Sequence, residues 1–206
     1  MKGYISLLVL FLVPAFMLTS GTALAQENEP LINGSVTHGG FGGPVVKVSS
    51  INGDLGLFVG GRGGWILNFK PNHAFVIGGG GYTLVSDVEI NDAMASGGPV
   101  DLDLSYGGLE VEYVNRTREV VHFSAQVLIG QGVAESSKEI RNGGDQDEGG
   151  FVVVEPGVNA LLKVTDYFRI GVGGSYRLIS GTDLDGLSDS ELSGASAVLT
   201  LKFGSF

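Results

Sequence analysis

YFRIGVGGSYRLIS, residues 167–180, alternates between two kinds of residue along its whole length. On one parity the residues are apolar apart from a single glycine: Phe168, Ile170, Val172, Gly174, Tyr176 and Leu178. The other parity, from Arg169 to Ile179, is mostly arginine, glycine and serine. Because successive residues of a strand point to opposite faces, this stretch predicts a strand with one apolar and one polar face.

The same alternation is clear in residues 121–129, 152–164 and 195–203 and weaker in residues 41–50, 55–69, 74–85 and 102–113. The charges inside these segments fall on the face opposite to the apolar residues. A lysine or arginine that faces lipid at mid-depth costs about 2–4 kcal/mol. A soluble barrel would carry its apolar face inside and its charges outside, so the pattern favours strands whose apolar face meets lipid and whose small polar face lines a narrow lumen.

The connections between the segments alternate in length. Residues 70–73, 116–118 and 165–166 form tight turns, whereas residues 87–100, 134–150 and 181–191 form longer loops. Tight turns at one end and long loops at the other are typical of up-and-down barrels. The sequence therefore predicts an all-β fold, an eight-stranded antiparallel up-and-down transmembrane β-barrel over residues 40–206, with both of its ends on the same side.

The residues before the barrel predict export. Met1–Ala25 has Lys2, an apolar run and an Ala23-Leu24-Ala25 cleavage site, as a secretory signal peptide does. A membrane anchor is the alternative, but the run is shorter than the ~20 residues of a spanning helix and contains Pro14. We expect residues 26–39 to be a flexible periplasmic lead-in.

Charge and cysteine content exclude several classes of partner and site. Loss of Lys2 with the signal peptide takes the net charge from −10 to −11. So acidic a chain is not expected to bind nucleic acid. The sequence has no cysteine, which excludes disulfides and thiolate metal sites.

Aromatic residues give a second prediction of membrane depth. Six of the apolar-face positions lie near a tight turn or the end of the chain and predict one interfacial belt: Trp65, Phe69, Tyr113, Phe123, Phe168 and Phe203. Tyr82 and Tyr176 suit a belt at the other interface. His38 and His73 lie in the lead-in and in a turn, so we expect neither to join a cluster of catalytic residues. In residues 102–113 the apolar parity changes, and Gly107-Gly108 predicts a bulge there.

Strand number, loop alternation, aromatic belts and a final Phe206 together resemble the small eight-stranded outer-membrane barrels of Gram-negative bacteria, the OmpA-type transmembrane domain and its relatives. The stretches Gly60–Trp65 and Glu155–Asn159 also look like uncharacterised barrels from Bacteroidetes-like genomes. The resemblance implies the cell outer membrane as location, with its lipid and the barrel-assembly machinery as partners, and we expect a monomer. The family carries its assembly signal on a terminal Phe with apolar residues at alternate positions before it. Here either a bulge at Gly204-Ser205 or Phe203 itself fits that signal.

Charges of both signs share the predicted lumen face, and a buried charge needs a partner. We expect them to form a structural, hydrogen-bonded plug rather than a catalytic site: Lys47, Arg62, Glu110, Glu112, His122, Glu155, Lys163, Arg169 and Arg177. Turn symmetry predicts four cross-strand contacts: Glu112 with His122, Glu155 with Arg177 as an ion pair, Asn159 with Gly173, and Lys163 with Arg169.

Two function classes remain open. The first is a structural or surface-interaction barrel without catalysis, cofactor or metal, whose acidic loops contact a surface ligand. The second is a small porin-like channel, or a membrane-embedded lipid hydrolase that uses Glu110, Glu112, His122 and Ser124. Asp183-Leu184-Asp185-Gly186 faintly resembles a calcium loop but lacks the remaining ligand spacing, so we expect a solvated loop.

Overall fold

The computed structural model describes residues 37–51, 53–70, 72–86, 89–90, 100–115, 119–137, 147–182 and 188–206. The predicted signal peptide, most of the lead-in, the turn at residues 116–118 and the calcium-like residues 183–186 lie outside these ranges. In the described ranges, no helix is long and apolar enough to span a membrane.

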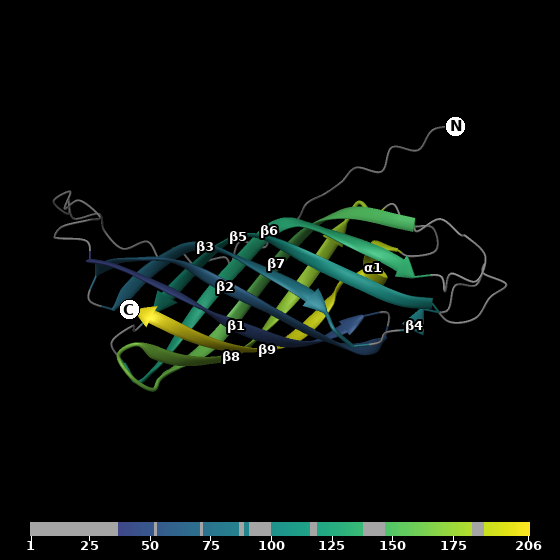
Figure 1. The fold of residues 1–206 in the computed structure, drawn as a ribbon. Coiled ribbons are helices and arrows are strands. Elements are labelled where there is room, and N and C mark those ends of the chain that lie inside the picture. The colour runs from purple at the N-terminus through teal and green to yellow at the C-terminus, as the bar shows by residue number, and fades with distance from the viewer. Residues whose placement is uncertain are drawn as a thin grey trace, which may run out of the picture. The chain divides into compact units, whose positions relative to one another are not determined.

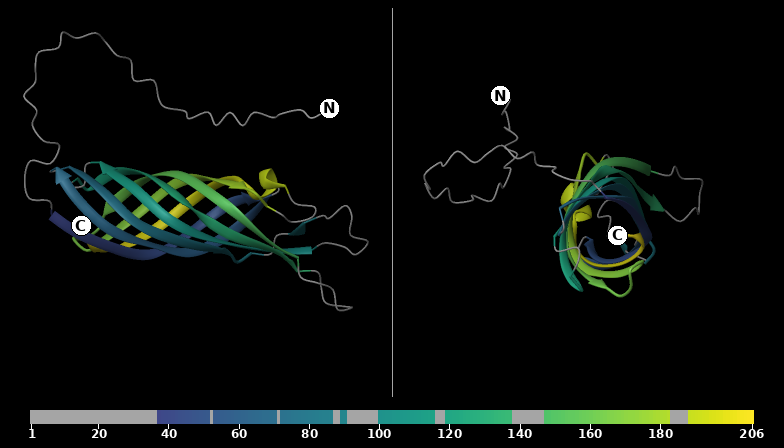
Figure 2. Two further views of the ribbon diagram at one scale, coloured as in Figure 1. Left: turned by 90° about the horizontal axis from the view of Figure 1, so that it is seen from above. Right: turned by 90° about the vertical axis from the view of Figure 1, so that its left-hand side faces the viewer.

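Eight long strands form a closed antiparallel barrel (Figures 1 and 2). They are β1 Thr37–Ile51, β2 Asp54–Lys70, β3 His73–Leu84, β5 Val100–Asn115, β6 Val121–Ser137, β7 Asp147–Lys163, β8 Phe168–Ser180 and β9 Gly194–Ser205. Each strand pairs with its neighbours in sequence, and pairings β1–β9 and β3–β5 close the ring. Two short elements remain, β4 Glu89–Ile90 beside β5 and helix α1 Asp189–Leu192 before β9. The predicted eight-stranded up-and-down barrel is confirmed.

The first and last strands of the barrel begin and end on the same side, because Gly40 pairs with Ser205 in antiparallel fashion. We call this side the turn end, since it carries the connections at residues 71–72, 116–120 and 164–167, and the opposite side the loop end. One loop-end connection is shorter than predicted, and the one between β1 and β2 is a tight turn. The β6–β7 register continues to Ser136 and Asp147, beyond the predicted loop boundary, and β1 reaches β2 through a tight turn in which Gly53 has φ 88°.

The outer surface of the barrel is apolar, as the alternation predicts. Large hydrophobic side chains such as Val158, Val172 and Ile129 are more than half exposed on the outside. On the same strands Glu155, Gly173 and Leu128 take the opposite parity, and Glu155 and Leu128 are almost fully buried. The outer face of these strands is thus apolar, and their charges face inward.

The predicted aromatic belt at the turn end is present on the outer face. Phe168 stacks on Phe203 with ring centroids 4.7 Å apart, and Phe69 stacks on Phe75 at 5.1 Å. His38 and His73 also lie in this belt. The ring of His38 stacks on Trp65 at 5.3 Å, and Nδ1 of His73 lies 2.6 Å from the Tyr113 hydroxyl. A histidine ring is amphipathic, so it suits this depth as tryptophan and tyrosine do.

The expected bulge in β5 is absent, and the prediction that Tyr82 faces lipid is wrong. Gly107 and Gly108 pair in unbroken register with β3 and β6. Leu104 and Tyr106 therefore face the lumen, where both are buried, and Tyr82 on β3 lies beside Tyr106. The apolar residues of β5 change from even to odd positions because the lumen is itself apolar toward the loop end, so that its inward residues there are apolar as well.

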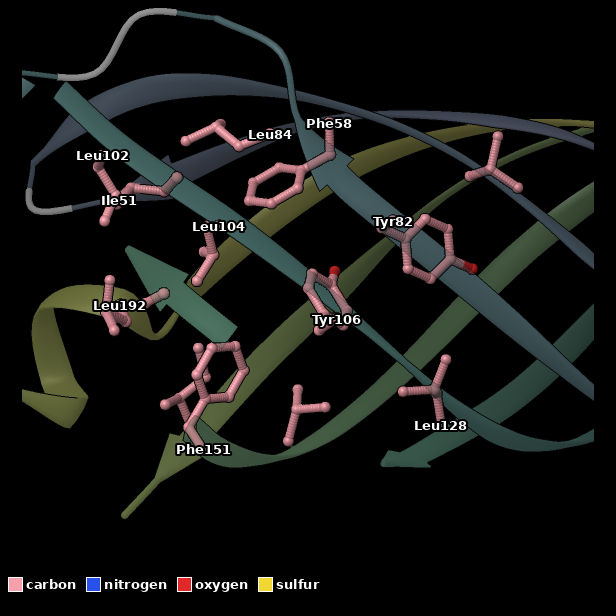
Figure 3. Packing of buried hydrophobic residues seen from close by; sticks show 14 of the residues in the cluster. Ile51, Phe58, Tyr82, Leu84, Leu102, Leu104, Tyr106, Leu128, Phe151 and Leu192 are labelled. Atoms are coloured by element: carbon pink, nitrogen blue, oxygen red, sulfur yellow. The ribbon is translucent and has the colours of Figure 1, made fainter. Parts of the chain in front are cut away.

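Two apolar clusters fill the lumen at different heights. The loop-end cluster contains Ile51, Phe58, Leu102, Leu104, Phe151 and, from α1, Leu192 (Figure 3). The turn-end cluster contains Phe41, Ile66, Ala74, Val76, Val114 and Leu161, with Phe206 packed against it. Along β5, the charged Glu110 and Glu112 lie between Tyr106 of the loop-end cluster and Val114 of the turn-end cluster.

Candidate functional site: the barrel lumen

The lumen holds the charged residues that the sequence analysis grouped together. All of the predicted cluster except Lys163 are buried, with at most 6 % of the residue surface exposed. Lys163 is half-buried at the turn-end rim, where its Nζ lies 2.7 Å from Asp166. Lys202 on β9, also buried, adds a further cation to the cluster.

Glu112 is the centre of the ionic group nearest the turn end. Its carboxylate accepts hydrogen bonds from Lys202 Nζ at 2.7 and 2.8 Å and from Arg62 at 2.9 Å. The guanidinium of Arg62 also donates to Glu110 and to Gln126. Four strands, β2, β5, β6 and β9, are joined by this network. Two carboxylates offset two cations, which buried charges require.

Glu155 is the centre of a second group nearer the loop end. It accepts hydrogen bonds from Lys47 Nζ at 2.7 Å, from the Tyr106 hydroxyl at 2.7 Å and from Ser175 at 2.5 Å. Lys47 Nζ also lies 3.2 Å from the centre of the Tyr82 ring, which stabilises the ammonium by a cation–π contact. Strands on opposite sides of the ring are thereby tied together through the lumen.

The predicted Glu155–Arg177 ion pair is wrong, although the register behind it holds. Asn159 pairs with Gly173, and Lys163 with Arg169, as turn symmetry predicted. Arg177 instead donates to the Leu192 carbonyl at 2.9 Å and to Ser49 at 3.1 Å, and its guanidinium stacks on Phe58. Glu155 turns toward Lys47 because the lumen lets side chains reach across the barrel rather than only to the next strand.

The predicted contact of Glu112 with His122 is also wrong. Glu112 pairs with Gln126, because the β5–β6 connection is longer than the three-residue turn assumed. His122 instead accepts a hydrogen bond through Nε2 from Arg169, at 3.1 Å. That places it at the turn-end mouth.

Glu112 and His122, two of the residues considered for a hydrolase, are engaged by other side chains. Glu112 is bound by two cations, and the Nε2 of His122 is taken by Arg169. Ser124 is buried on the lumen face, away from the lipid that such an enzyme would attack. Among the described residues, no three of His, Cys, Asp and Glu gather where they could hold a metal ion.

Three features of the lumen were missed from sequence. Tyr82 and Tyr106 face inward. Without a bulge, the even-numbered residues of β5 share the face of Glu110 and Glu112, which would have placed Tyr106 in the lumen. Helix α1 was also missed, although Ser188-x-x-Glu191 is a capping-box pattern. The Ser188 amide donates to the Glu191 carboxylate at 2.7 Å, and the helix places Leu192 on the apolar cluster (Figure 3).

The sequence matches no protein-family model and none of the curated proteins. The fold is similar to two solved structures. One is Ail, the attachment invasion locus protein of Yersinia pestis, with 15 % identity, a TM-score of 0.51 and coverage of 81 % of this chain and 97 % of that one. The other is Neisserial surface protein A (NspA), with 10 % identity, a TM-score of 0.50 and coverage of 82 % and 99 %.

At these identities the likeness concerns the fold. The resemblance of the sequence to small eight-stranded barrels is confirmed at that level.

Proposed function

We propose that this protein is a closed outer-membrane β-barrel with a structural or surface-interaction role and without catalysis. The observation that carries the proposal is the inverted distribution of side chains. Apolar residues form the outer face over all eight barrel strands, while the buried carboxylates of Glu110, Glu112 and Glu155 are paired with cations inside.

A membrane location explains the outer face. Exposed side chains such as Leu109, Trp65 and Phe123, each more than half exposed, would meet water in a soluble protein. Contiguous apolar surface of this extent is costly in water and favourable in lipid. The aromatic belt at the turn end matches the depth of an interface. The fold shared with Ail and NspA supports the outer membrane in particular.

A lumen closed to solutes is supported by the layers inside it. Leu104 and Leu192 pack at the loop end, the Glu155 and Glu112 groups fill the middle, and Phe206 packs at the turn end. Eight strands leave an interior that side chains nearly fill. These layers argue against the porin-like alternative, and the occupied Glu112 and His122 argue against the hydrolase.

A surface-interaction role rests on the loop end. The predicted loops there are rich in aspartate and glutamate, and of these Asp189 and Glu191 lie in the first turn of α1. Ail and NspA carry names that describe an attachment protein and a surface protein. We expect the acidic loop end to be the face that meets a ligand outside the cell.

Cell fractionation combined with protease treatment of whole cells tests the proposal. We expect the protein in the outer-membrane fraction, cleavage confined to the loop end, and no release of fatty acid from lipid A or phospholipid by the refolded protein. Recovery in a soluble fraction would contradict the location, and lipid hydrolysis that is abolished by His122→Ala would contradict the assignment of the lumen as non-catalytic.

A further inference from the structure

Three cations stand side by side at the turn-end mouth of the lumen. Lys163 on β7 pairs directly with Arg169 on β8, and Arg169 pairs directly with Lys202 on β9. Like charges at directly opposed positions of a sheet destabilise it. Each of the three therefore requires an anion nearby.

Two of the three cations have an anion nearby. Lys163 is paired with Asp166 at 2.7 Å, and Lys202 with Glu112 at 2.7 Å. Within the described ranges, no carboxylate lies at ion-pair distance from Arg169. Its guanidinium meets His122, and its Nε has no hydrogen-bond partner although the residue is only 6 % exposed. A buried guanidinium without an anion is costly.

The cavity beside Arg169 is lined mostly by apolar side chains. The ring of Phe206 lies 3.9 Å from the guanidinium carbon and stacks on Phe41. Ile66, Val114 and Leu161 line a cavity of about 20 Å³ under Phe206, together with the polar Asn68 and Lys202. So small a cavity holds about one water molecule. A larger ligand can reach Arg169 only if Phe206, which follows the last residue of β9, swings away.

We propose that Arg169 is the anchor of a second site, which binds a carboxylate carried on a small apolar body and is covered by Phe206. The planar guanidinium fits a carboxylate in bidentate fashion. The apolar walls and Phe41 fit the body of the ligand, in the space that the Phe206 ring fills in the closed state. A phosphate fits less well, because it would leave its hydrated oxygens against Ile66, Val114 and Leu161.

Benzoate is the probe, since its ring matches that of Phe206 in size. The full chain in detergent micelles is titrated with sodium benzoate, and binding is followed by the NMR resonance of the His122 ring, which touches Arg169. Sodium chloride and sodium phosphate are titrated at equal ionic strength. Heat-shifted mobility on gels confirms that each variant is a folded barrel.

Wild type is expected to show a saturable shift with benzoate and none with chloride. Phe206→Ala should bind about tenfold more tightly because the cover is gone, and Arg169→Gln about tenfold more weakly because a charged hydrogen-bond donor is lost. Arg177→Gln is the matched control. It removes a buried lumen arginine away from this mouth and should leave the affinity unchanged.

The absence of a saturable shift in both wild type and Phe206→Ala overturns the proposal, as does an equal response to chloride. Tighter binding of phosphate than of benzoate overturns the assignment to a carboxylate. If Arg169→Gln does not fold, the comparison of Phe206→Ala with wild type decides, and equal or weaker binding by Phe206→Ala counts against a covered site. The outcome is independent of the outer-membrane proposal, since it concerns the lumen alone.

Discussion

The two halves of the lumen are built from the same strands by different means, and β5 shows both. Toward the loop end its inward side chains are Leu102 and Leu104, which pack with α1. Nearer the turn end they are Glu110 and Glu112, which bind Arg62 and Lys202, followed by Val114 in the turn-end cluster. One face of one strand thus changes from apolar packing to ionic hydrogen bonding within a few residues.

The difference shows how the stability of the barrel depends on apolar packing in one half of the lumen and on charge pairing in the other. Apolar packing tolerates rearrangement and loses stability in proportion to the contacts removed. A buried ionic group depends on complete pairing, because an unpaired charge retains its whole desolvation cost. Substitutions in the two halves should therefore differ in how much stability they remove. They should also differ in whether a second substitution restores stability, and in how stability responds to pH.

The largest effect is expected from Glu112→Ala. The change leaves Lys202 without a carboxylate and Arg62 with Glu110 alone. We expect the free energy of unfolding in detergent to fall by about 4 kcal/mol, measured by urea titration of heat-modifiable mobility.

Rescue separates loss of charge from loss of volume at this site. Glu112→Leu combined with Lys202→Leu should be less destabilised than Glu112→Ala, since no uncompensated charge remains. A double variant as unstable as Glu112→Ala would show that volume and not pairing dominates the turn-end half.

Leu104→Ala should destabilise by about 3 kcal/mol, as for a buried leucine in a well-packed core. Leu109→Ala on the same strand is the matched control, because Leu109 faces outward with 76 % exposed. It should change stability much less in the same titration. Equal effects of the two substitutions would mean that the loop-end half of the lumen is not packed.

A double-mutant cycle distinguishes the observed partner of Glu155 from the one expected by symmetry. Lys47→Met and Glu155→Gln should couple by about 2 kcal/mol, because the two side chains touch in the lumen. Arg177→Met and Glu155→Gln should couple by under about 0.5 kcal/mol. The reverse order of coupling energies would restore the cross-strand ion pair.

The smallest effect concerns α1, which covers the apolar half. The Asp189 carboxylate accepts hydrogen bonds from the Thr182 and Gly181 amides at 2.9 and 3.1 Å, and the bond from Thr182 is the main cause that holds the pKa of this carboxyl below its ordinary value. The stabilisation is present above the pKa of the unfolded chain and is lost as the pH falls through the lower folded pKa. Amide exchange of Thr182 should rise in acid beyond its intrinsic dependence on pH, and Asp189→Asn should remove that excess.

The sequence alone predicts most of the barrel and the inward face. Alternation in residues 167–180 and the lengths of the connections were enough for strand number, topology and the placement of Arg169 and Arg177. The register of β7 and β8 could also be predicted, because the turn that joins them is short. The observed pairing of Lys163 with Arg169 agrees with that prediction.

Partners in the lumen could not be predicted in this way. Glu155 meets Lys47 and Tyr106 across the ring, and no cross-strand rule relates positions on strands that are not neighbours. The predicted contact of Glu112 with His122 was wrong for a different reason. The β5–β6 connection is longer than the tight turn assumed, so the register of the two strands differs from the predicted one. The error at Tyr82 and Tyr106 came from expecting a polar lumen throughout, whereas an apolar half exists where α1 covers it.

Electrical recording in planar lipid bilayers tests most directly the central claim that the two halves together close the lumen. Purified, refolded wild-type protein should insert without producing conductance steps in 1 M KCl. Glu112→Ala, if its barrel remains folded, should produce such steps. Stable, reproducible channels from the wild-type barrel would contradict the account.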